Sequence, residues 1–315
     1  MAGGGWRADT VFDVPGIVDR KALKAGVRDQ KDDQMEAIIH IGLAKTGSST
    51  IQAFLDDNKA QLLKQSVRYD RSISDLANNV EFAVAARVLT GEDVPKDALR
   101  HKLHLKTTAD HHAFFKRFEA DFRARRITWQ EDVFIGSSEQ ISAWAKKPRH
   151  IQALDGFLLR HFSDVRYVVY LRRQEETILS SYSERIKRGS TECFDDHLEK
   201  RLVTNLLKTV RLWANTVGPE RLSVRLLERD FLQGGDLLQD FCAQVGIEDV
   251  ALTRPQSQNE SLSAWAAERL RRLNVYMPPF KANGRRMFGR RRILRSRVCS
   301  SGIYFGQQLT TTQRQ

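Results

Sequence analysis

The sequence is poor in cysteine and has no long hydrophobic run. Its three cysteines, Cys193, Cys242 and Cys299, have neither the spacing of a disulfide framework nor that of a metal site. No run of about 18 apolar residues occurs, so we expect no transmembrane segment. The N-terminal stretch MAGGGWRADTVFDVPGIVDRK has no apolar signal-peptide core before its charges. These absences favour a cytoplasmic protein with a loosely ordered leader over residues 1–35.

Acidic residues are missing from the C-terminal segment 281–315. This segment carries nine of the basic residues and no acid, so it supplies +9 of the net charge of +12. Such a run can bind an anionic ligand, an acidic acceptor, a nucleic acid or a membrane surface, or it can be a solvated tail.

A glycine-containing loop follows the first apolar run. In HIGLAKTGSST (40–50), Gly42 and Gly47 have the spacing of the nucleotide-binding motif G-x-x-x-x-G-K-[ST], but position 48 is serine. The only lysine, Lys45, lies inside the loop. Helix N-terminal N–H groups and nearby hydroxyls can still bind an anion there. The loop therefore fits a phosphate or sulfate group better than a magnesium–triphosphate, although a capped strand-to-helix turn would look similar.

Extended and helical patterns alternate along the chain. We expect strands at 37–42, 132–138, 165–171 and 222–228, and helices at 50–64, 74–89, 109–125, 148–162, 174–188, 197–216, 235–245 and 261–275. This order predicts an α/β fold in which helices flank a parallel sheet on both faces. In such sheets ligands bind at the carboxyl ends of the strands.

A second candidate motif follows the predicted strand 165–171. In LRRQEETILSSYSERIKRG, Arg172 and Arg173 leave the strand, and each has a serine eight residues later, Ser180 or Ser181. An arginine and a serine two helical turns apart can converge on one phosphate. Either pair fits this spacing, and solvated side chains are the plain alternative.

These two motifs resemble those of the sulfotransferases that use 3′-phosphoadenosine 5′-phosphosulfate (PAPS), particularly the bacterial branch. HIGLAKTGSSTIQAFL resembles the loop for the 5′-phosphosulfate, and VVYLRRQEETILSSY resembles the segment for the 3′-phosphate. VFIGSSEQIS, VRLLERDFLQGGDLLQDFCAQVGI and NESLSAWAAERLRRLN also resemble this branch. The similarity spans residues 36–275 and implies a P-loop NTPase-like sulfotransferase architecture.

Roles follow from the resemblance, position by position. Lys45 matches the loop lysine, which stabilises the leaving oxygen, and Arg172 and Ser180 match the 3′-phosphate ligands. The rest of the 5′ cradle would be Thr46, Gly47, Ser48, Ser49 and Thr50. The family's glycine-rich closing motif has no clean match; KANGRRMFGRRR, with Lys281, Arg285 and Arg286, is only a positional substitute.

The catalytic base is expected at Glu139, just past the predicted strand 132–138. Other members of the fold have a catalytic histidine or glutamate near this position. His111 and His112 are alternatives, whereas His40 belongs to the first strand and is expected to be buried. Glu139 can also be a carboxylate that only stabilises a helix N-terminus.

The resulting hypothesis is a sulfotransferase domain at 36–280 followed by the basic segment 281–315. It would transfer a sulfuryl group from PAPS, without a metal, to a hydroxyl on a carbohydrate, glycolipid or small metabolite, releasing PAP. No specific nucleic acid partner is expected. The alternatives are a P-loop kinase with an atypical loop and a nucleic-acid or membrane-surface binder that uses the arginine-rich tail.

Overall fold

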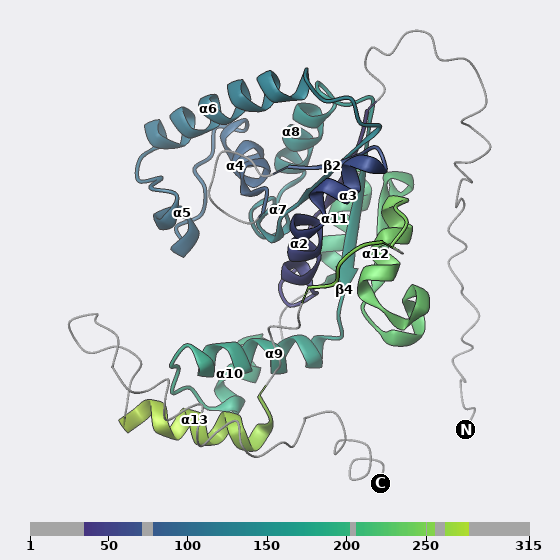
Figure 1. Cartoon of the computed structure of the whole chain (residues 1–315). Coiled ribbons are helices and arrows are strands. Elements are labelled where there is room, and N and C mark those ends of the chain that lie inside the picture. The colour runs from purple at the N-terminus through teal and green to yellow at the C-terminus, as the bar shows by residue number, and fades with distance from the viewer. Residues whose placement is uncertain (1–34, 71–77, 202–205, 250, 256–261, 277–315) are drawn as a thin grey trace, which may run out of the picture. The chain divides into compact units, whose positions relative to one another are not determined.

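The computed structural model describes residues 35–70, 78–201, 206–249, 251–255 and 262–276, and the described residues belong to one compact unit that begins at Met35 (Figure 1). The expected leader (apart from Met35) and the basic segment 281–315, with Lys281, Arg285 and Arg286, lie outside the described residues.

The described strands form one all-parallel sheet in the order β2-β3-β1-β4-β5. They are β1 Glu36–His40, β2 Val67–Tyr69, β3 Val133–Ser137, β4 Asp164–Leu171 and β5 Leu222–Leu226. The α-helices are α2 Ser48–Asp57, α3 Lys59–Lys64, α4 Val80–Val88, α5 Ala98–Lys102, α6 Thr108–Arg126, α7 Glu139–Trp144, α8 Pro148–Leu158, α9 Gln174–Lys187, α10 Phe194–Arg201, α11 Leu206–Val217, α12 Leu237–Val245 and α13 Ala264–Tyr276. Three short 3-10 turns complete the elements: η1 Pro219–Arg221, η2 Arg229–Phe231 and η3 Gln233–Gly235.

The central strand β1 is buried on both faces. Ala37 and Ile39 pack into a core shared with α4, α6, α7, α8 and α11, whereas Ile38 packs into a second core shared with α2, α3 and α12. Successive side chains of a strand point to opposite faces, so a continuous apolar run suits a strand covered on both sides. The predicted α/β fold, a parallel sheet flanked by helices on both faces, is confirmed.

A third, smaller core joins α9, α10 and α13. Tyr182 and Ile186 of α9 pack with Ala267 and Leu270 of α13, and these helices lie together beyond the end of β4 in Figure 1. The side-chain amide of Asn274 donates to the carbonyl of Ile186 (2.9 Å). These contacts hold the C-terminal half of α9 against α13.

Some predicted elements were wrong in detail. Strand β2 was missed because three residues show no periodicity. The expected helix 50–64 is two helices that meet at Asn58, whose amide donates to the carbonyls of Phe54 (2.7 Å) and Thr253 (2.8 Å). The short helices α5 and α7 were not predicted. The expected helix 197–216 corresponds to α10 and α11, on either side of residues 202–205, which are not among those described.

Candidate functional site

The loop between β1 and α2 is shaped by its two glycines. A Cβ on Gly42 would lie 2.3 Å from the Oγ of Ser48, and one on Gly47 would lie 2.3 Å from Cδ2 of Leu237. Gly47 also has φ +82°, the left-handed region that glycine adopts at little cost. Close approach of backbone to neighbouring side chains therefore explains both glycines.

The hydroxyls of this loop divide into two groups. Thr46 and Ser48 are buried, and their hydroxyls donate to the carbonyl of Leu43 at 2.8 and 3.4 Å. Ser49 and Thr50 are exposed in the first turn of α2. The first N–H groups of a helix lack intrahelical partners, and α2 has neither a side-chain cap nor an acid in its first turn. The start of α2 can therefore donate hydrogen bonds to an anion, with Thr46 and Ser48 building the loop behind it.

Lys45 lies in the middle of the loop, and its side chain reaches α9. Its φ is +67°, and its ammonium forms an ion pair with Glu184, which also pairs with Arg188. Partial burial lowers the pKa of Lys45, as do the charges of Arg188, Lys187 and Arg172, whereas the charge of Glu139 raises it. Charged side chains from α9, its two ends and the start of α7 thus act on the ammonium group.

Arg172 joins the strand end to the same loop. Its Nη1 donates to the carbonyl of Lys45 at 3.4 Å, and its Nε donates to Glu176 at 2.8 Å. Glu176, Ser180 and Glu184 are spaced four apart on α9, so they lie on one face of the helix. Ser180 therefore lies between the carboxylate that binds Arg172 and the one that binds Lys45.

The alternative pair, Arg173 and Ser181, points elsewhere. Arg173 is exposed and forms two hydrogen bonds to Glu228, at 2.8 and 3.0 Å. The hydroxyl of Ser181 donates to the carbonyl of Ile178 (2.9 Å) and lies 2.8 Å from Nε2 of His197. Of the two arginines, Arg172 therefore contacts the Lys45 loop, and Arg173 contacts Glu228.

Glu139 is the first residue of α7, and Ser138 caps that helix through the N–H of Gln140. The Glu139 carboxylate accepts a hydrogen bond from the side chain of Gln140 at 3.2 Å. One turn later, the hydroxyl of Ser142 donates to the carbonyl of Gly42. The contact from Ser142 places α7 against the loop. From this helix, the charge of Glu139 raises the pKa of Lys45.

The three histidines considered from the sequence, His40, His111 and His112, lie in different surroundings. His111 is buried and bonds to Asp93 (2.9 Å) and to the carbonyl of Leu105 (3.3 Å), and His112 is exposed on α6. His40 is buried at the end of β1, as expected, with Nδ1 2.9 Å from the Oγ of Ser137. Burial lowers the pKa of His40 to about 4. The side chain of Gln52 of α2 donates to the same Ser137 hydroxyl at 3.3 Å. His40 and Gln52 therefore share one buried partner below the loop.

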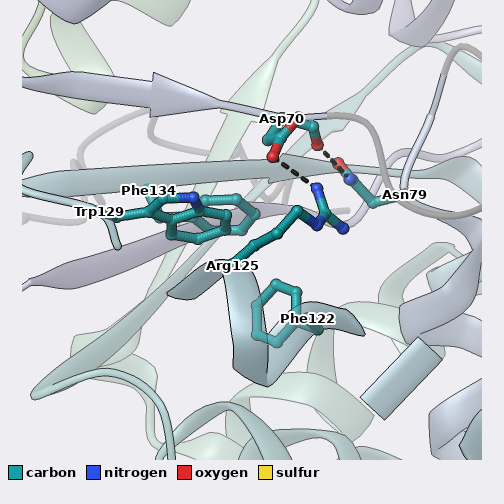
Figure 2. Close-up of a pocket in the computed structure, with 6 residues that line it drawn as sticks. All are labelled: Asp70, Asn79, Phe122, Arg125, Trp129 and Phe134. Carbon is teal, nitrogen blue, oxygen red and sulfur yellow. Dashed lines mark hydrogen bonds and ion pairs between the residues drawn. The ribbon is translucent and has the colours of Figure 1, made fainter. Parts of the chain in front are cut away.

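A separate small pocket lies at the β2 edge of the sheet (Figure 2). Its interior has no room for a molecule the size of water. Its lining residues are Asp70, Asn79, Phe122, Arg125, Trp129 and Phe134. An ion pair between Arg125 and Asp70 (2.5 Å) crosses it, as Figure 2 shows. Pockets for small-molecule ligands usually measure about 300–1,000 Å³, so a pocket without room for water cannot hold a nucleotide.

Among the described residues, no cluster of three or more His, Cys, Asp or Glu has the arrangement of a metal site. In the same part of the chain, no helix combines the length and hydropathy that crossing a membrane requires.

The sequence did not point to Glu176 and Glu184 as parts of the site. Their spacing of four on either side of Ser180 was the available signal. The spacing could not show that Lys45 and Glu184, which are 139 positions apart in the chain, form an ion pair.

No protein-family model and no curated protein matches this sequence. Among solved structures, a sulfotransferase from Alicyclobacillus acidocaldarius is similar at 16% identity and a TM-score of 0.40, over 71% of this chain and 85% of that one. The sulfotransferase domain of the Synechococcus PCC 7002 olefin synthase is similar at 12% identity and a TM-score of 0.33, over 74% of this chain and 81% of that one. Likenesses this remote carry no argument about fold or function.

Proposed function

We propose that this protein is a sulfotransferase that moves a sulfuryl group from PAPS to a hydroxyl acceptor and releases PAP. The observation that carries the proposal is the meeting of two anion-binding elements at the carboxyl ends of adjacent strands. The Lys45 loop follows β1, Arg172 follows β4, and a hydrogen bond from Arg172 to the carbonyl of Lys45 joins them. Ligands of open α/β sheets bind at this edge.

In this proposal the loop holds the 5′-phosphosulfate. The N–H groups at the start of α2 and the exposed hydroxyls of Ser49 and Thr50 donate to its oxygens, as at other helix N-termini that bind phosphate. Arg172 and Ser180 hold the 3′-phosphate, the arginine through a charge-assisted bond and the serine through a neutral one. Both phosphates then lie along the face of α9 that carries Glu176, Ser180 and Glu184.

Two residues act on the reacting atoms. Glu139 accepts the proton of the acceptor hydroxyl as its oxygen forms a bond to sulfur. The bond from sulfur to the bridging oxygen breaks at the same time, and Lys45 stabilises the negative charge that develops on this oxygen. The chemistry is an in-line displacement in which positioning and electrostatics supply most of the catalysis, as in phosphoryl transfer. No metal is needed in this scheme.

The acceptor is proposed as a hydroxyl of a carbohydrate, glycolipid or small metabolite, as the sequence resemblance implies. A cytoplasmic site of action is also part of the proposal. It is supported by the scarcity of cysteine and by the free thiols of Cys193 and Cys242.

The test is a thermal shift measured with PAP in the presence of EDTA and, separately, with magnesium–ATP. A ligand that binds only the native state raises the free energy of unfolding by about 2.7 kcal/mol when its concentration is 100 times its dissociation constant. PAP should raise the melting temperature without metal, and ATP should raise it much less. An equal or larger shift with magnesium–ATP would indicate a kinase instead.

A further inference from the structure

The loop lysine already has a carboxylate partner on α9. The ammonium of Lys45 and the carboxylate of Glu184 form an ion pair in which the side chains are 27% and 33% exposed. Glu184 also pairs with Arg188, one turn further along α9, whose side chain is 78% exposed. A ligand anion that uses Lys45 must therefore compete with Glu184.

A similar ion pair lies eight residues earlier on α9. Arg172 is paired with Glu176, again from α9, at 2.8 Å. Glu176 and Glu184 lie four residues before and after Ser180, on one face of the helix. Each cation assigned to a phosphate thus contacts a carboxylate from the helix that the ligand would follow.

We propose that Glu184 is a positioning residue that competes with the anionic ligand for Lys45 and so sets how tightly this site binds anions. The inference rests on the proposed function, because it takes the phosphosulfate end of PAPS as the competing anion. When the anion binds, Lys45 turns from Glu184 to the ligand, and Glu184 keeps Arg188 as its partner. Glu184 is not a catalytic residue in this account, since it acts through Lys45.

The pair selects for ligand charge. Lys45 leaves Glu184 only for a group that attracts an ammonium more strongly than a carboxylate does. A weakly charged anion gains little from the exchange, whereas a multiply charged phosphosulfate gains much more. Removing the charge of Glu184 should therefore tighten anion binding, although it deletes an ion pair of the folded protein.

The first experiment measures PAP binding by calorimetry, in EDTA, to wild type, Glu184→Gln and Glu175→Gln. Glu175 is exposed in the first turn of α9 and has no assigned role, so its variant makes the same change of net charge on the same helix. We expect Glu184→Gln to bind PAP about three- to tenfold more tightly than wild type, and Glu175→Gln to stay near wild type. A purely structural Glu184 would give a lower melting temperature with no gain in affinity, and that result would overturn the inference.

A double-mutant cycle tests whether the effect passes through Lys45. In the Lys45→Met background, Glu184→Gln should no longer tighten PAP binding, because the competition has been removed. An equal gain in both backgrounds would mean that Glu184 repels the ligand directly, and the role assigned to the pair would be wrong.

A labelling experiment separates this inference from the proposed function. Acetic anhydride in limiting amount labels amines, and peptide mass spectrometry reports the rate at Lys45. Glu184→Gln should raise this rate above that of Glu175→Gln, and inorganic phosphate should protect Lys45 at a lower concentration in Glu184→Gln. If no variant binds PAP while both labelling results hold, the sulfotransferase proposal fails and the competition stands. If the labelling rates are equal, the competition fails whatever PAP does.

Discussion

His40 gives a quantitative prediction about stability. It is fully buried at the end of β1, and burial lowers its pKa from 6.5 to about 4. The unfolded chain therefore binds a proton at this residue at a higher pH than the folded protein does. Stability from a neutral His40 is fully present above pH 6.5 and is lost as the pH falls through the folded value near 4.

The magnitude follows from the size of the shift. One pKa unit corresponds to about 1.4 kcal/mol, so the full shift of His40 changes the free energy of unfolding by about 3 kcal/mol. Between pH 7 and pH 5 the loss should be about 2 kcal/mol. Few carboxylates titrate in this range, since their ordinary pKa values are close to 4.

The assay is urea unfolding followed by tryptophan fluorescence at pH 7 and pH 5, for wild type, His40→Asn and Ile41→Val. Asparagine keeps a polar group close to the Oγ of Ser137 but does not titrate. Ile41 is a buried neighbour, so its variant lowers stability while retaining His40. We expect His40→Asn to lose about 2 kcal/mol less than the other two proteins on acidification. An equal loss in all three would refute a neutral, buried His40.

Two further predictions concern the site. Arg172→Ala should weaken PAP binding about tenfold to hundredfold, as expected for a charge-assisted bond, while Arg173→Ala, which loses only contacts to Glu228, should bind nearly as wild type. Calorimetry checks the order, and the reverse order would shift the assignment by one residue. Glu139→Gln should lose about 10²-fold or more in sulfuryl-transfer rate to a hydroxyl acceptor with PAP affinity unchanged, because glutamine keeps the size of the side chain without its basicity. A full rate together with a slightly lower melting temperature would instead assign Glu139 to helix stabilisation.

The loop was predictable because its constraints are local. Gly42 and Gly47 are separated by a fixed spacing; a Cβ on Gly42 would meet Ser48 of the same loop, and Gly47 has φ +82°. The apolar run of β1 likewise carries its own signal, since burial on both faces permits a continuous hydrophobic sequence. Such features can be recognised without knowing the rest of the fold.

The different contacts of the two arginines after β4 were not predictable, for the opposite reason. Arg172 and Arg173 each have a serine eight residues later, so the local sequence treats them alike. What distinguishes them is Glu228, which follows β5 and forms two hydrogen bonds to Arg173. A contact across 55 positions of the chain leaves no trace in a local pattern.

The position of the lysine is the main difference between this loop and the nucleotide-binding motif of kinases. In the kinase motif the lysine occupies position 48, but Ser48 is buried here, and its Oγ would lie 2.3 Å from a Cβ on Gly42. A side chain at position 48 is therefore directed into the loop, and a lysine there would have to displace its neighbours. Lys45, with φ +67°, instead reaches Glu184 of α9. In the proposed function the ammonium therefore lies beside the helix face that carries Ser180, and we expect this arrangement to suit a ligand with two separate phosphates better than a linear triphosphate held along the loop.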